Sequence, residues 1–169
     1  MSVYFGGSRS SINVTTALSP IIGAVVASGQ KIHVGCQFGA DQMVLFYAPA
    51  SSLVVFAVAP HLGVAPVHVQ QAARSGARVV LAAGGRSAPI PARYLLRSIA
   101  AFQGCSQAVF FSPGSGSLAV ARECVRSGLP VFAFGEQPAQ IPSCTGEWVC
   151  ASYLGLACWC WLPTQQSMF

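Results

Sequence analysis

The chain has 169 residues, of which 53% are hydrophobic and only 8% are charged, and its mean hydropathy is +0.58. This length fits one domain with a substantial core. The sequence contains no uninterrupted apolar run of about 20 residues, which argues against a membrane span. The formal net charge of +5 comes from nine basic residues against four acidic ones, a balance that favours an anionic ligand without identifying it.

The cysteines and histidines give no metal-binding pattern. The seven cysteines are odd in number and contain no CxxC pair, and the N-terminus lacks the basic and apolar segments of a secretory signal. These features predict reduced thiols and a cytoplasmic location. Cys158 and Cys160 fit no zinc spacing with His33, His61 or His68, so no metal and no cofactor is predicted.

Short apolar runs alternate with helix-like stretches, which is the pattern of a parallel sheet covered on both faces. The predicted strands are 3–5, 31–34, 53–58, 79–82, 108–111 and 131–134, with a further one at 148–151. The predicted helices are 14–28, one from about Ala40 that stops before Pro49, 66–75, 92–102 and 118–127. We therefore predict a single α/β domain over residues 1–169. It should be a three-layer, Rossmann-like, doubly wound fold with a mainly parallel sheet of about six to seven strands.

Residues 136–169 form an apolar extension that is rich in tryptophan. Trp159, Trp161, Leu162 and Phe169 are costly to leave in water. They either form a contact between subunits or pack back on their own sheet, and the sequence leaves both readings open. The apolar excess of the whole chain is typical of a surface hidden in an oligomer, so we expect a homo-oligomer.

Three predicted strands end in glycine-rich loops, whose backbone can approach a ligand closely. The N–H groups and dipole of a following helix attract anions. If the first, second and fifth strands are neighbours, the loops converge on one phosphate-binding cleft at the carboxyl ends of the strands. The loops supply Gly7, Ser8 and Arg9; then Gly35, Gln37, Gly39 and Asp41; and finally Pro113, Gly114, Ser115, Gly116 and Ser117.

Two of these residues also have purely structural interpretations. Ser117 is a suitable N-cap for the helix that follows it, which would make the third loop an ordinary capped turn. Asp41 would either accept a hydrogen bond from a ribose or base, or cap the helix that begins near Ala40.

The order of these motifs resembles that of the DNA-processing protein A family. That family has SGSL before a helix with small residues and then a strand of the form VFAxPG, as in Ser115–Leu118 and Val131–Gly135 here. The Gly7-Ser8-Arg9 turn resembles its GSR turn, and GCQFGAD at 35–41 is similar to its GxARGID loop. Arg93 and Arg97 match its arginine-bearing helix.

The same pattern is similar to the wider SLOG superfamily, which includes the LOG phosphoribohydrolases, and it covers roughly residues 3–135. The resemblance implies a Rossmann-like fold that binds nucleotides, nucleotide-derived signals or single-stranded DNA. Two departures matter. LOG enzymes carry PGGxGTxxE, but here Val120 stands at the glutamate position and Glu123 lies nearly one turn further on. Phe38 replaces the basic residue of GxARGID.

Three functions follow from these residues. The first is non-catalytic binding of a nucleotide or nucleotide-derived small molecule, with Arg9 and Arg97 neutralising phosphate. The second is binding of single-stranded DNA along a basic groove. The third is a LOG-like phosphoribohydrolase or N-glycosidase with Glu123 as its carboxylate. Whether the chain is an enzyme stays open. The basic groove of the second function would use Arg74, Arg78, Arg86, Arg93, Arg122 and Arg126.

Overall fold

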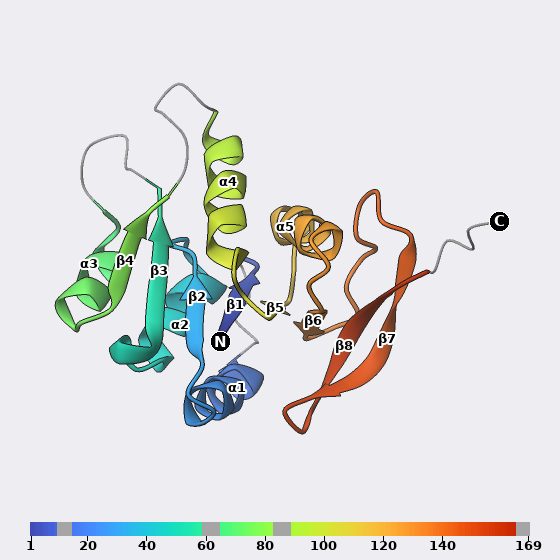
Figure 1. Ribbon diagram of the computed structural model, residues 1–169, viewed down its shortest axis with the longest axis horizontal. Coiled ribbons are helices and arrows are strands. Elements are labelled where there is room, and N and C mark those ends of the chain that lie inside the picture. Colours follow the sequence, from blue (N-terminus) through green and yellow to red (C-terminus); the bar gives the residue numbers. More distant parts are fainter. Residues whose placement is uncertain (10–14, 59–64, 83–88, 165–169) are drawn as a thin grey trace.

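A computed structural model of the chain describes residues 1–9, 15–58, 65–82 and 89–164, with no side-chain description at 15 and 16. Within these residues an eight-stranded sheet forms the centre and five α-helices cover it (Figure 1). No helix of this described part is long and apolar enough to cross a membrane. No three His, Cys, Asp or Glu side chains in it are placed to hold a metal ion, and His61 lies outside it.

The sheet is mostly parallel, as predicted, and its strands follow the order β4-β3-β2-β1-β5-β6-β8-β7. The first six in this order pair in parallel, whereas β8 is antiparallel to both β6 and β7. The sheet therefore has eight strands, where the sequence predicted six to seven. Their bounds are β1 Ser2–Gly7, β2 Lys31–Val34, β3 Leu53–Ala57, β4 Arg78–Leu81, β5 Gln107–Phe111, β6 Val131–Phe134, β7 Gly146–Tyr153 and β8 Leu156–Pro163.

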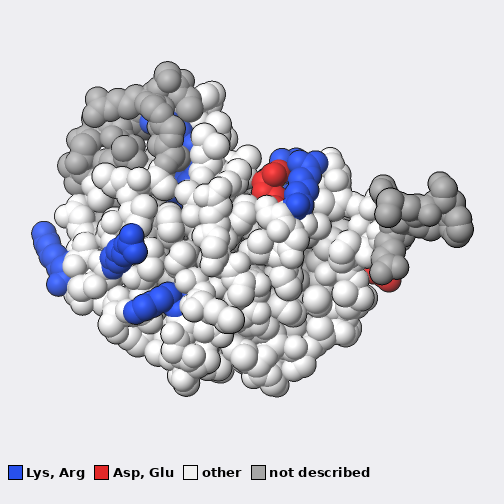
Figure 2. Space-filling view, viewed as in Figure 1, with Lys and Arg blue, Asp and Glu red and all other residues white. Residues whose placement is uncertain are grey.

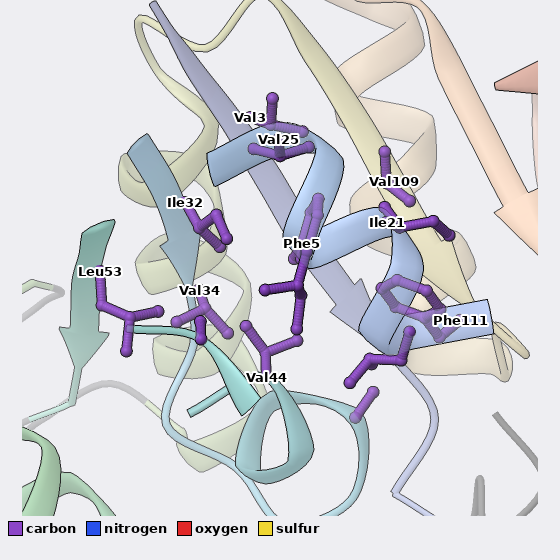
Figure 3. Packing of buried hydrophobic residues seen from close by; sticks show 14 of the residues in the cluster. Val3, Phe5, Ile21, Val25, Ile32, Val34, Val44, Leu53, Val109 and Phe111 are labelled. Carbon is purple, nitrogen blue, oxygen red and sulfur yellow. The ribbon is translucent and has the colours of Figure 1, made fainter. Parts of the chain in front are cut away.

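Helices lie on both faces of the sheet. The bounds are α1 Thr15–Ala27, α2 Ala40–Tyr47, α3 Val67–Arg74, α4 Ile90–Phe102 and α5 Ser115–Arg126, with a short 3-10 helix at Ala50–Ser52. The first three helices pack on one face and share its core cluster, and α4 and α5 share the core cluster of the other. Figure 3 shows the part of the first cluster that comes from the strands, α1 and α2. The bulky apolar side chains of the strands, which lack the polar alternation of a half-exposed sheet, are thereby buried on two sides.

The alternation of side chains along β1 divides its residues between the two faces. Val3 and Phe5 are fully buried against α1 and α2, where Figure 3 shows Phe5 beside Ile21 and Val44. Tyr4 faces the opposite way and belongs to the cluster of α4 and α5. This alternation places Tyr4 on the face that α4 covers, where its ring packs against Phe102 at 6.2 Å between ring centroids.

The C-terminal extension forms a β-hairpin that joins the main sheet. The predicted strand at 148–151 is the centre of β7, and β8, which was not predicted, pairs it with β6. Trp161 is 3% exposed and packs edge-to-face against Trp148 at 5.3 Å between ring centroids. For this part of the extension, packing on its own sheet is the correct alternative. Leu162 is exposed, and Phe169 lies outside the described residues.

Candidate functional site

The strand order reverses between β1 and β5. The chain runs outward from β1 through β2 and β3 to β4, and then returns to the other side of β1 to form β5 and β6. Loops that leave two such strands turn in opposite directions and open a crevice at the carboxyl end of the sheet. Gly7 and Phe111 are register partners, so the two strand ends coincide. The first, second and fifth strands are therefore neighbours, which is the condition that convergence of the three loops required.

A cavity of about 860 Å³ lies at this point. Ten of the residues that the sequence singled out line it. They are Gly7, Ser8, Arg9, Gln37, Asp41, Arg97, Gly114, Ser115, Gly116 and Ser117. The cavity therefore joins residues of all three glycine-rich loops with one arginine of α4.

The first turn of α5 forms one wall of the cavity. The helix begins at Ser115, three residues earlier than predicted, with Gly114 as its N-cap. The interpretation of Ser117 as N-cap is wrong, because its hydroxyl instead donates a 2.7 Å hydrogen bond to the carbonyl oxygen of Gly7. Glycine has no side chain with which to bond the first N–H groups of the helix. The positive end of a twelve-residue helix thus lines the cavity.

Hydrogen bonds hold the first loop to β5 and to the second loop. The backbone N–H of Ser8 donates to the carbonyl oxygen of Phe111 in β5 at 3.1 Å, and the N–H of Ala40 donates to the carbonyl oxygen of Ser8 at 3.1 Å. The Nε of Arg9 donates to Oε1 of Gln37 at 2.7 Å. Gly39 has φ +85°, and a Cβ there would overlap the backbone of Ser8 and Arg9, so both its conformation and its surroundings require glycine.

A buried ion pair forms the floor of the site. Arg97 Nη1 lies 3.3 Å from Asp41 Oδ2, and the two side chains are 4% and 9% exposed. The backbone N–H of Gln37 donates to the same carboxylate oxygen at 3.1 Å. A Cβ at Gly35 would overlap both charged groups, which explains the glycine at this strand end. Burial is the largest single influence and acts to lower the pKa of the Arg97 guanidinium, but Asp41, Tyr4 and Cys36 together outweigh it and raise that pKa.

The opposite wall was missed in the sequence. It comes from the N-terminal half of α4, whose Tyr94 ring centroid lies 5.6 Å from the Arg97 guanidinium carbon. Burial raises the pKa of Tyr4 well above its usual range, so this hydroxyl, which hydrogen-bonds Ser98, stays protonated. The additional lining residues are Tyr4, Ile90, Pro91, Ala92, Tyr94, Leu95, Ser98, Phe110, Ala119 and Val120.

Five predicted site residues lie outside the cavity lining. Gly35 and Gly39 support the loops from behind, and Pro113 precedes the α5 N-cap. Arg93 is 3% exposed within α4, so it does not present its charge to solvent. Glu123 does not face the cavity. Its carboxylate lies 2.8 Å from Arg122 Nε and 3.4 Å from Arg126 Nη1 on the far part of α5.

The arginines of the predicted groove are spread over distant elements. Arg74 and Arg78 belong to α3 and β4 at one edge of the sheet, whereas Arg122 and Arg126 belong to α5 over β5 and β6. Arg86 lies outside the described residues. In Figure 2 the acidic side chains on this face appear only over α5 and towards β7 and β8, while the area over α3, β4 and β3 shows basic ones. The described arginines do not form one stripe.

No protein-family model and no curated protein matches this sequence. Among solved structures, the chain is similar to DNA processing protein A from Helicobacter pylori, which was described for its single-stranded DNA binding mode. The two share 16% sequence identity with a TM-score of 0.66, over 84% of this chain and 67% of that one. The likeness shows that the fold is like that of DNA processing protein A.

Proposed function

We propose that the cleft binds a nucleotide by its phosphate and does not turn it over. One observation carries this proposal: the uncapped start of α5 and the buried guanidinium of Arg97 line the same cavity at the reversal of strand order. The reversal and the helices on both faces support a Rossmann-like assignment. Membership of the SLOG superfamily rests on the order of the sequence motifs alone.

The anion-binding end is built from α5 and the first loop. The first three N–H groups of an α-helix have no partner within the helix, and its dipole adds positive potential at the same place. A phosphate at Ser115–Ser117 would accept hydrogen bonds from these N–H groups, and Arg9 would add a charged donor. The formal net charge of +5 also favours an anionic ligand.

Arg97 supplies a second, independent indication of a ligand. Its ion pair with Asp41 uses Nη1, and its Nε is buried without a hydrogen-bond partner among the described residues. Buried donors are nearly always hydrogen-bonded, so an unpaired one beside a cavity marks a position where a bound group is expected. An oxygen of a ligand in the cavity would satisfy this guanidinium without breaking its pair with Asp41.

The α4 wall suits the sugar and base of a nucleotide. Tyr94, Leu95 and Pro91 give this wall an apolar surface. Tyr4 and Ser98 add hydroxyl groups to the lining of the same cavity. Ligand sites commonly combine such an apolar lining with a few polar groups that fix orientation. The volume of about 860 Å³ leaves room for a whole nucleotide.

The acidic groups support binding rather than catalysis. Among the described residues, Asp41 is the one carboxylate in the lining, and it is engaged with Arg97 and with the N–H of Gln37. Glycosidic cleavage needs a carboxyl group that can reach the scissile bond. Glu123, the carboxylate that a hydrolase would require, faces Arg122 and Arg126 instead.

Binding of single-stranded DNA is the second candidate. The protein whose fold this chain shares was described for binding single-stranded DNA, and a cleft that holds one nucleotide would also hold one unit of a strand. The two candidates differ in measurable ways. A strand binder would bind oligonucleotides more tightly than mononucleotides and would lose affinity steeply with added salt.

Gly116 offers a matched pair of variants that tests the phosphate site. It is the second residue of α5, lines the cavity, and has open space where a Cβ would be. Gly116→Asp places a negative charge at the helix start, which stabilises the helix by about 0.3–1 kcal/mol but repels a phosphate. Gly116→Ala removes the glycine without adding charge, which stabilises by about 0.5–1 kcal/mol.

Isothermal titration with thymidine monophosphate, thymidine and inorganic phosphate would measure the effect. We expect Gly116→Ala to bind thymidine monophosphate like the wild type. Gly116→Asp should lose about tenfold or more, which corresponds to about 1.4 kcal/mol, with its melting temperature unchanged or raised. Equal binding of thymidine monophosphate by Gly116→Asp and wild type would refute a phosphate site at α5.

A further inference from the structure

We propose that Phe38 stacks on the base that follows the bound nucleotide, so that the site binds a single strand of nucleic acid more tightly than a free mononucleotide. This inference rests on the proposed function, because it assumes a nucleotide in the cleft. It names a side chain that replaces a basic residue of the resembling family, and it chooses between the two ligand classes discussed above.

Phe38 is not part of the cavity lining but is next in the chain to a residue that is. Its side chain is 66% exposed, and it directly follows Gln37, which lines the cavity. Gln37 accepts a 2.7 Å hydrogen bond from Arg9, and Gly39 packs against the backbone of Arg9. The residues on both sides of Phe38 in the chain therefore contact Arg9, which is exposed and lines the cavity.

The ring of Phe38 is held in place by a histidine of α3. The two ring centroids are 5.3 Å apart with an interplanar angle of 63°, an edge-to-face arrangement. His68 is itself fixed, because its Nε2 hydrogen-bonds the carbonyl of Cys36 at 2.9 Å. A ring that is supported on one side and exposed elsewhere loses little further freedom when a planar group stacks on it.

Exposure of one phenylalanine carries no meaning by itself, since isolated exposed apolar side chains are common. Its position gives the argument. A base inside the cavity would contact α4. The Phe38 ring is outside the cavity lining, so it can contact only a part of the ligand that extends out of the cavity. In a strand that part is the neighbouring nucleotide, whose base offers a flat apolar face to an aromatic ring.

Charge favours nucleic acid over another partner at this rim. Three of the four acidic residues lie at position 123 or later, and the fourth, Asp41, is buried against Arg97. Arg9, which hydrogen-bonds the residue before Phe38, would bind the phosphate that joins the two nucleotides. An aromatic ring next to a cation is the combination by which proteins hold single strands without reading their sequence.

The test compares Phe38→Ala with Phe46→Ala on ligands of increasing length. Phe46 is a suitable control because it is 79% exposed and lies near the opposite end of α2. Titrations would use thymidine monophosphate, the dinucleotide and the trinucleotide of thymidine. We expect Phe38→Ala to leave mononucleotide affinity unchanged and to weaken trinucleotide binding about 5- to 100-fold. Phe38→Trp should retain the affinity, and Phe46→Ala should resemble wild type.

A trinucleotide with one abasic position provides a direct check on stacking. Removing the base that contacts Phe38 should weaken wild-type binding as much as Phe38→Ala does, and the two changes together should cost no more than either one. Equal losses of mononucleotide and trinucleotide affinity in Phe38→Ala, or no loss of either, would overturn this inference and leave the phosphate site intact. If the wild type binds none of the three ligands, the proposed function fails as well.

Discussion

Replacement of Arg97 by methionine tests whether the buried ion pair holds the site together. The guanidinium is 4% exposed and lies 3.3 Å from Asp41, whose side chain is 9% exposed. Breaking such a pair by removing one partner costs about 3–5 kcal/mol, because the remaining charge stays buried. Methionine keeps most of the apolar stem, so this loss reports the charge rather than a cavity.

Two features of the site place the expected loss in free energy of unfolding at the lower end of that range. Asp41 keeps the hydrogen bond from the N–H of Gln37, and the adjacent cavity lets water reach the carboxylate. We therefore expect Arg97→Met to lower the free energy of unfolding by about 3 kcal/mol.

Urea denaturation followed by the fluorescence of the buried tryptophans would measure the loss. The control is a double-mutant cycle with Asp41→Asn, which leaves Arg97 without its charged partner. Each single variant should lose about 3 kcal/mol, and the double variant should lose clearly less than their sum. Losses that add within about 0.5 kcal/mol would show that the two charges are not coupled, and would refute the reasoning.

Two further predictions concern the rest of the fold. Leu154 has φ +51° in the two-residue turn between β7 and β8, where asparagine is much better tolerated, so Leu154→Asn should raise the free energy of unfolding by about 0.5–1 kcal/mol in the same assay. Leu154→Ala, which keeps the strain, should not. Burial lowers the pKa of His33 below 6.5, against the opposing hydrogen bond with Ala101, so the neutral form is favoured on folding. The free energy of unfolding should then fall as pH drops below about 6.5. Between about pH 7 and pH 5, His33→Gln should lose less of this free energy than the wild type does. Equal losses in the two proteins would contradict this prediction.

The sheet could be predicted because its strands are apolar on both faces. All five residues of β3 are buried, and the uninterrupted run Leu-Val-Val-Phe-Ala indicates just that. The order of the strands could not be predicted in the same way, because buried parallel strands resemble one another and their connections do not reveal which strands pair. The meeting of β2, β1 and β5 was therefore a condition of the prediction until the structure supplied it.

The hairpin of β7 and β8 was missed for a local reason. Its turn is Leu154-Gly155, with φ +51° and +82°, whereas the usual signal for such a turn is Asn-Gly or Asp-Gly. The start of α5 was missed because serine is a common N-cap. In the structure the hydroxyl of Ser117 bonds Gly7 across 110 residues of sequence, a long-range contact that local propensity does not report.

The α4 wall of the cleft could not be predicted from sequence motifs. Tyr94, Leu95 and Ser98 belong to no glycine loop, and they line the cavity only because α4 returns the chain to β5 beside β1. Arg97 was predicted as a phosphate ligand, but the structure pairs its Nη1 with Asp41 and leaves its buried Nε without a hydrogen-bond partner among the described residues. One guanidinium thus joins α4 to the second loop and also faces the cavity. A ligand that bonds it would strengthen the same contact that holds the walls together, so binding and stability of the cleft should rise together.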